Sequence, residues 1–226
     1  MALQKFEKNL RVADIGDEVP NFTLESQMGM ITWHDLIDAK WAVLFTFHTA
    51  FDPVATSEIG MLCKLRDEFD SRNITVAFMG ADTVTNYREW ITDIEELQNV
   101  KVNVPLIADE ADCSVLQQYG VARPTPPTMV CKPVSHGIFL VDIDRRLRIS
   151  MKYSMAVGRN VYEILRAFDA MQLTIYHKVI VPANWGNGNE VMVHNDVTNE
   201  QANEAFEKGF VQIKPWFRVT PAPDRA

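Results

Sequence analysis

The chain has 226 residues, of which 47% are hydrophobic and 23% charged, and its formal net charge at neutral pH is −8. This length allows one sizeable core with a smaller appended region, and the negative charge argues against nucleic acid or an anionic membrane as partner, because both would repel it. No apolar run approaches the roughly 20 residues that span a bilayer, and residues 1–20 lack the apolar centre of a secretion signal. We therefore expect a cytoplasmic protein, with a trimmed organellar precursor as the alternative.

The first half of the chain alternates strand and helix patterns. Residues 41–47, WAVLFTF, form a continuous apolar run that predicts a strand buried on both faces. Pro53 fits the first turn of a helix, and residues at helical spacing continue that helix to Phe69. The other elements expected here are strands over 30–33, 74–80 and 104–108, a helical turn over 34–37, and helices over 85–97 and 111–119.

The second half predicts a proline-rich loop over 123–128, a hairpin of strands 137–142 and 147–153, and a helix over 160–170. Strands alternating with helices predict an α/β fold, a central sheet flanked by helices. From about residue 179 the sequence becomes rich in turns, with a short helix expected over 199–206. We therefore divide the chain into a main domain, 1–178, and a small C-terminal region, 179–226, which is too short to bury a core alone.

Seven motifs occur in one order along nearly the whole chain: GDEVPNF (16–22), ITWHDL (31–36), WAVLFTF (41–47), FDPVATSE (51–58), GRNVYEILR (158–166), MQLT (171–174) and VPANWGNGNEVMV (181–193). Together they resemble the 1-Cys peroxiredoxins, a family of thioredoxin-fold peroxidases. The resemblance implies a thioredoxin-like fold and a homodimer whose C-terminal region reaches the other subunit. Trp185 would then be a lid over the partner's pocket.

The resemblance breaks at the site of peroxide chemistry. In that family a cysteine near the start of the helix attacks the peroxide, and a threonine three residues earlier orients it. Here Ala55 stands at the cysteine position, Asp52 at the threonine position and His136 at an arginine position. Two further changes, Phe47 and His48, replace a histidine and a proline, whereas Arg159 keeps its place.

A methyl group cannot attack an O–O bond, so we expect no thiol peroxidase chemistry at residue 55. Several changes around one site indicate natural divergence rather than a single engineered replacement. Titratable side chains at these positions are typical of acid/base catalysis. We therefore expect redox-independent catalysis, of isomerase, cyclase or lyase type, on a small organic anion.

In this hypothesis Asp52 or His48 is the base, His136 is its partner, and Arg159 binds the anion. The other residues expected to line the pocket are Ala55, Phe47, Phe51, Glu58 and Trp185. No glycine-rich nucleotide motif is present, so we expect no organic cofactor. His48, Asp52 and His136 could also hold a metal, but we favour hydrogen-bonded side chains without one.

Two alternatives remain open. The first is a non-catalytic binding or scaffolding protein, in which the polar residues of the site satisfy one another. The second is residual peroxidase activity through another thiol, which would be Cys63, Cys113 or Cys131.

Overall fold

The computed structural model describes residues 11–110, 112–123 and 132–223, and it divides into two compact units, Met1–Arg159 and Asn160–Ala226. The boundary predicted from the sequence, between residues 178 and 179, lies farther along the chain. Helix α6 (Val161–His177) accounts for the difference, because its residues Ala170 and Leu173 pack into the apolar core of the second unit. Most of the expected proline-rich loop, from residue 124, and Cys131 lie outside the described residues.

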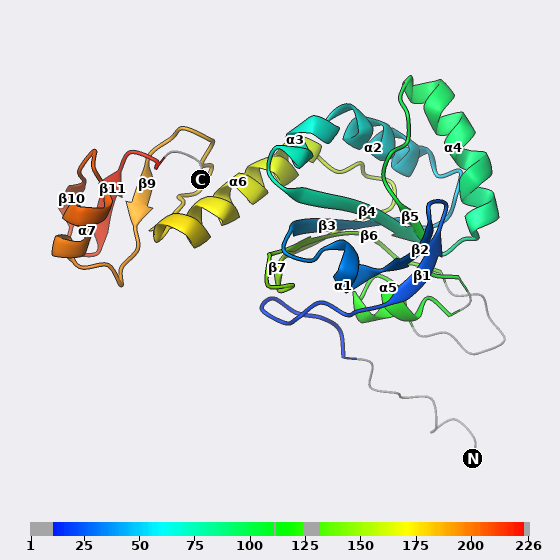
Figure 1. Ribbon diagram of the computed structural model, residues 1–226, viewed down its shortest axis with the longest axis horizontal. Helices are drawn as coiled ribbons and strands as arrows, with labels where there is room; N and C mark the ends of the chain where they lie inside the picture. Colours follow the sequence, from blue (N-terminus) through cyan, green and yellow to red (C-terminus); the bar gives the residue numbers. More distant parts are fainter. Residues whose placement is uncertain (1–10, 111, 124–131, 224–226) are drawn as a thin grey trace, which may run out of the picture. The chain divides into compact units, whose positions relative to one another are not determined.

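Within the described part of the first unit, strands form one mixed sheet in the order β2-β1-β5-β4-β3-β6-β7 (Figure 1). The central strands β3, β4 and β5 are parallel, and the remaining strands pair antiparallel. The strands are β1 (Thr23–Ser26), β2 (Gly29–Thr32), β3 (Trp41–Thr46), β4 (Ile74–Gly80), β5 (Leu106–Ala108), β6 (His136–Val141) and β7 (Leu147–Tyr153).

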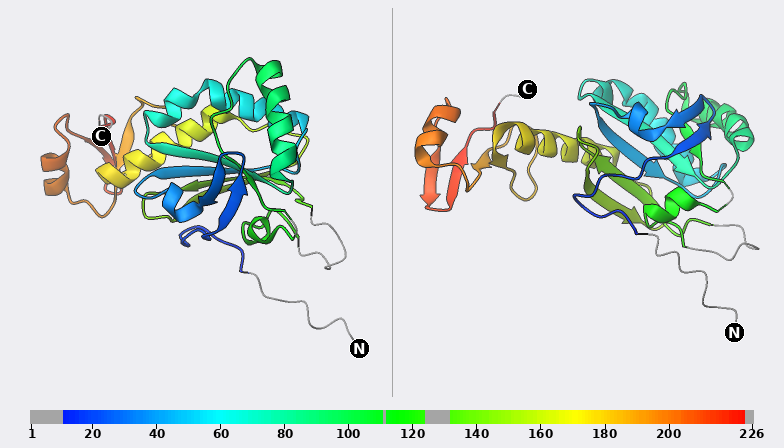
Figure 2. Two further views of the ribbon diagram at one scale, coloured as in Figure 1. Left: turned by 45° about the vertical axis from the view of Figure 1, so that its right-hand side comes forward. Right: turned by 60° about the horizontal axis from the view of Figure 1, so that its bottom comes forward.

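Strand β3 is buried along its whole length because helices cover both faces of the sheet. Side chains alternate along a strand, so Leu44 joins the core on the face of α5, whereas Phe45 points to the other face and stacks on Phe78 with ring centroids 4.9 Å apart. Figure 2 shows α2 and α4 on one face and α5 on the other. The helices are α1 (Trp33–Leu36), α2 (Pro53–Lys64), α3 (Arg66–Asp70), α4 (Val84–Gln98) and α5 (Ser114–Gln118).

The predicted α/β arrangement is therefore confirmed, with local differences. The helix expected from Pro53 to Phe69 is interrupted at Leu65, which leaves helical geometry with φ −101° and ψ 15°. Helix α6 runs to His177 rather than ending at Ala170, and Lys178 ends it in the left-handed conformation.

The second unit consists of α6, a sheet in the order β10-β11-β9-β8, and α7 (Asn199–Ala205). Its core contains buried residues from helices, strands and loops, including Trp185, Val191 and Phe206. Both helices of this unit were predicted from the sequence, α6 only as far as residue 170. The strands were missed because each has two to four residues: β8 (Val179–Ile180), β9 (Val191–Val193), β10 (Val211–Lys214) and β11 (Phe217–Thr220).

Candidate functional site

Helix α2 begins directly after the turn that follows β3, and Asp52 is its N-cap. The Asp52 backbone is extended, Pro53 occupies the first turn, and the Ala55 backbone N–H donates to Oδ1 of Asp52 over 2.8 Å. An aspartate in this position satisfies an amide that the helix itself cannot pair. The Asp52 carboxylate thus caps the first turn of α2, and Ala55 is fully buried beneath this turn.

Thr56 links this turn to the neighbouring helix. Its hydroxyl donates to the carbonyl of Asp52 over 2.8 Å and accepts a hydrogen bond from the Trp90 indole over 3.0 Å. Trp90 lies on α4, so the start of α2 is fixed against α4 by a buried hydrogen bond. Neither residue was predicted to belong to the site, and no local pattern in the sequence pointed to them.

Glu58 and Arg159 form a buried ion pair. The Arg159 Nε and its backbone N–H both donate to Oε1 of Glu58 over 2.8 Å, and Nη2 donates to Oε2. Nη1 donates to the carbonyls of Thr46 over 2.9 Å and Gly137 over 2.7 Å. Of the five N–H donors of the guanidinium, these contacts use all except one on Nη2.

The guanidinium also lies 4.9 Å from the centre of the Phe45 ring, and the side chain of Arg159 is fully buried. These contacts hold the arginine in place within the first unit. We predicted that Arg159 binds an anion through a pair of N–H donors. Glu58 already accepts from Nε and Nη2, so it occupies the position that a carboxylate or phosphate ligand would take.

His136 begins β6 and is fully buried, yet neither ring nitrogen has a hydrogen-bond partner among the described residues. Its Nε2 lies 3.8 Å from Oδ2 of Asp52. Burial lowers the pKa of His136, and the charge of Arg159 lowers it further, against opposing effects of Glu58 and Asp52. The imidazole is therefore neutral at physiological pH.

The remaining predicted residues have different surroundings. Phe47 is fully buried, with its ring 5.6 Å from that of Tyr87 and 5.4 Å from that of Trp90, so it belongs to the core. His48 is partly exposed and interacts electrostatically with His136. Phe51 is 52% exposed and has a positive φ of 61°.

Trp185 belongs to the second unit, where it is 2% exposed and its indole donates to the Asn189 carbonyl over 3.1 Å. Its ring is thus part of that unit's core. The structure brings together Ala55, Asp52, Glu58, His136 and Arg159, with His48 beside them. The role of Trp185 as a lid over a partner's pocket stays a prediction.

The two cysteines in the described part of the chain, Cys63 and Cys113, differ from a reactive cysteine site. Burial raises the pKa of Cys63, which disfavours the thiolate that attacks peroxides. Cys113 is 1% exposed. The described residues contain no group of three or more histidine, cysteine and acidic side chains arranged to hold a metal ion.

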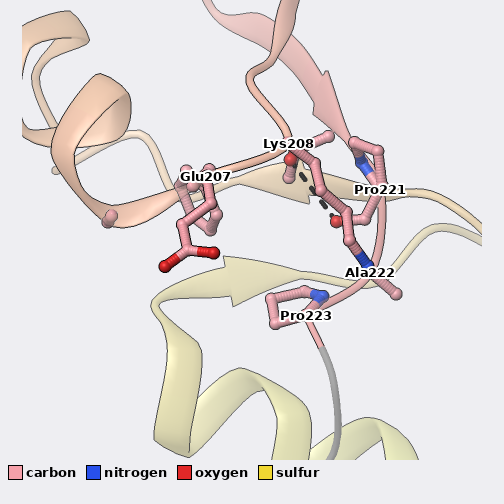
Figure 3. Close-up of a pocket in the computed structure, with 8 residues that line it drawn as sticks. Glu207, Lys208, Pro221, Ala222 and Pro223 are labelled. Atoms are coloured by element: carbon pink, nitrogen blue, oxygen red, sulfur yellow. Dashed lines mark hydrogen bonds between the residues drawn. The ribbon is translucent and has the colours of Figure 1, made fainter.

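A separate pocket of about 190 Å³ lies in the second unit (Figure 3). Its lining includes Glu207, Lys208 and the segment Pro221–Pro223. Its lining includes none of the residues predicted for the functional site. Across the described ranges, no helix has both the length and the apolar character needed to cross a membrane.

Comparison with known proteins shows the family to which the chain belongs. The model of the AhpC/TSA family matches residues 15–150, and that of the C-terminal domain of 1-Cys peroxiredoxin matches residues 170–209. A 1-Cys peroxiredoxin of Dictyostelium discoideum is 37% identical over 211 residues, covering 93% of this chain and 86% of that protein. The chain belongs to the 1-Cys peroxiredoxin family.

Other peroxiredoxins support the same assignment. Peroxiredoxin-6 of Gallus gallus is 34% identical over 220 residues, covering 93% of this chain and 98% of that protein. The solved structure of a yeast mitochondrial 1-Cys peroxiredoxin has a TM-score of 0.85 and 32% identity, covering 93% of this chain and 100% of the other. A cysteine-to-serine mutant of peroxiredoxin 6 of Arenicola marina has a TM-score of 0.82, also with 32% identity, covering 93% and 99%.

The thioredoxin-like peroxiredoxin fold predicted from the sequence is therefore confirmed. The match to the family's C-terminal domain begins within α6, where residue 170 lies. This agrees with the grouping of α6 with the second unit.

Proposed function

We propose that this peroxiredoxin-family protein does not reduce hydroperoxides at residue 55, and that it uses the inherited fold as a ligand-binding or scaffolding protein. The observation that carries the proposal is the hydrogen bond from the Ala55 amide to the Asp52 carboxylate. A negative side chain occupies the start of α2, where the family's reactive thiolate would need amides and positive charge.

The buried ion pair of the site agrees with a non-catalytic role. Arg159 is held by Glu58 and by two backbone carbonyls, and Ala55 and His136 are fully buried. Such pairing is what buried polar groups require for stability. It supports a binding role better than the turnover of a small anion, because the arginine that would bind the anion is engaged.

Peroxide consumption tests this proposal. The wild-type protein is compared with a variant in which all three cysteines are serine, and with a stepwise series that introduces Ala55→Cys, then Asp52→Thr, then His136→Arg. We expect equal background rates in the first two proteins and measurable turnover only when all three changes are combined. Turnover by the wild type that disappears in the cysteine-free variant would instead establish the residual-thiol alternative.

Acid/base catalysis is the second candidate, favoured by the unpaired, neutral imidazole of His136 beside Asp52. A neutral histidine near a carboxylate can accept a proton at pH 7. Base-catalysed ring opening of benzisoxazole provides a probe reaction for wild type, Asp52→Asn and His136→Gln. A rate lost in both variants supports catalysis by this pair, whereas equal rates in all three proteins exclude it for this probe.

We also propose that the protein is a cytoplasmic homodimer whose second unit contributes to the interface, on the strength of the match to the family's C-terminal domain. Light scattering after size exclusion should then give twice the 25.7 kDa mass of one chain. One relative, from Saccharomyces cerevisiae, is named as mitochondrial, so imaging of the tagged protein is the appropriate test of the compartment.

A further inference from the structure

The site contains hydrogen-bonding capacity that the protein itself does not use. Oδ1 of Asp52 accepts the Ala55 amide, but Oδ2 makes no hydrogen bond with a described residue. Both ring nitrogens of His136 are likewise without partners there, although the ring is fully buried. A buried polar group in this condition costs about 1–3 kcal/mol, so natural proteins rarely retain one without a use.

The two groups face each other across a gap that suits a bridging donor. Nε2 of His136 and Oδ2 of Asp52 are 3.8 Å apart, which is too far for a direct hydrogen bond. With the proton on Nδ1, the neutral imidazole presents Nε2 as an acceptor. A single atom carrying two hydrogens and placed to one side of the gap reaches both acceptors at about 2.8–2.9 Å.

The charges around the gap determine what kind of ligand fits. Asp52 lies at its edge, with a side chain 17% exposed. Arg159 and Glu58 neutralise each other in their buried pair, and His48 and His136 are the remaining titratable groups that act on the site. The acceptors are therefore not balanced by a free cation among the described residues, and an anionic ligand would meet the Asp52 carboxylate directly.

We propose that Asp52 and His136 bind a small primary ammonium group, with one N–H donated to Oδ2 of Asp52 and another to Nε2 of His136. This inference rests on the proposed function as a binding protein and names the ligand class of the same site. It also replaces the anionic substrate expected from the sequence. The ligand enters from the exposed edge of Asp52, and His136 forms the buried end of the site.

Nuclear magnetic resonance of the full-length protein, labelled with ¹⁵N in its histidines, tests the proposal. Methylammonium chloride is titrated while the His136 ring nitrogens are observed. Tetramethylammonium carries the same charge without an N–H, methanol offers a neutral donor, and sodium acetate supplies an anion, all at matched ionic strength. We expect a saturable shift of the His136 resonance with methylammonium and no saturable shift with tetramethylammonium or acetate.

Asp52→Asn is the informative variant, because asparagine keeps the helix cap while removing the charge. We expect it to weaken methylammonium binding by at least tenfold. His136→Phe, which keeps the ring buried without nitrogens, should weaken binding several-fold, measured from the His48 ring nitrogens, and serves if Asp52→Asn does not fold.

Absence of a saturable shift in the wild type would overturn the inference, as would unchanged affinity in Asp52→Asn. Methanol binding as tightly as methylammonium would overturn the ammonium assignment. A directly observed Nε2–H hydrogen bond to Asp52 that methylammonium leaves intact would show that the pair closes on itself. None of these results changes the peroxide measurements, so failure of the ligand and failure of the proposed function are distinguishable.

Discussion

Replacing Glu58 by glutamine tests the buried ion pair that holds the candidate site together. The carboxylate accepts two hydrogen bonds at Oε1, from the Nε and the backbone N–H of Arg159, and one at Oε2 from Nη2. Glutamine has the same shape and retains one acceptor oxygen. Its amide NH₂ would face the Nη2 donor, and the charge that neutralises the guanidinium would be lost.

The expected decrease in the free energy of unfolding follows from these contacts. One charge-assisted hydrogen bond is lost outright, worth about 1.5–3 kcal/mol, and the guanidinium remains buried with only backbone carbonyls and the amide oxygen. Breaking a buried pair by removing one partner costs about 3–5 kcal/mol, and we expect Glu58→Gln to fall in this range. For a chain of this length, about 2–4 °C per kcal/mol makes the melting temperature lower by roughly 6–20 °C.

Urea denaturation and scanning calorimetry measure this change. Glu163→Gln is the matched control, because Glu163 pairs with Arg166 within α6 and both side chains are partly exposed, at 43% and 36%. Exposed pairs contribute about 0–1 kcal/mol, so the control should lie close to wild type. A loss below about 1 kcal/mol in Glu58→Gln would refute the view that this pair is structurally required.

Three further changes give measurable outcomes. In Ala55→Cys, the Asp52 carboxylate should keep the new thiol's pKa at or above the usual value of about 8.5, so thiolate alkylation below pH 7 would contradict the site description. Burial raises the pKa of Asp109 to about 6 from 3.8, so native Asp109 holds its proton more tightly than in the unfolded chain, and its contribution to stability is lost as pH rises from about 4 through 6. Asp109→Asn should therefore gain on the order of 2–3 kcal/mol relative to wild type between pH 4 and pH 7, and a constant difference in denaturation midpoint would argue against this. Thr56→Val removes the hydroxyl between Asp52 and Trp90 and should cost about 1–3 kcal/mol in urea denaturation, whereas Thr56→Ser should retain most of the stability.

The sheet could be predicted because its central strands are marked by continuous apolar runs. The runs over 41–47 and 74–80 match β3 and β4 closely, and the hairpin strands correspond to β6 and β7. The second sheet could not be predicted in this way. Its strands are too short to show a period, and β10 is exposed along its whole length.

The candidate site was predicted only in part, because its decisive contacts join residues distant in the sequence. The family resemblance singled out Asp52, Ala55, His136 and Arg159, but it did not show which residues they contact. Glu58 and Arg159 are separated by 101 positions, so no local sequence pattern could show that they form an ion pair. The N–H donors of Arg159 that this pair occupies could therefore not be predicted either. The helix cap at Asp52 could have been predicted from the sequence, because an aspartate directly before a proline is typical of the start of a helix.

Strand β10 forms an outer edge of the second sheet, and its structure limits what can attach there. It pairs with β11 on one side, and the pairing shifts register between Gln212 and Lys214. An irregular edge that also carries a lysine is a poor template for an additional strand from another molecule. This end of the sheet is therefore protected against lateral aggregation, even though Val211 and Ile213 expose apolar side chains to solvent.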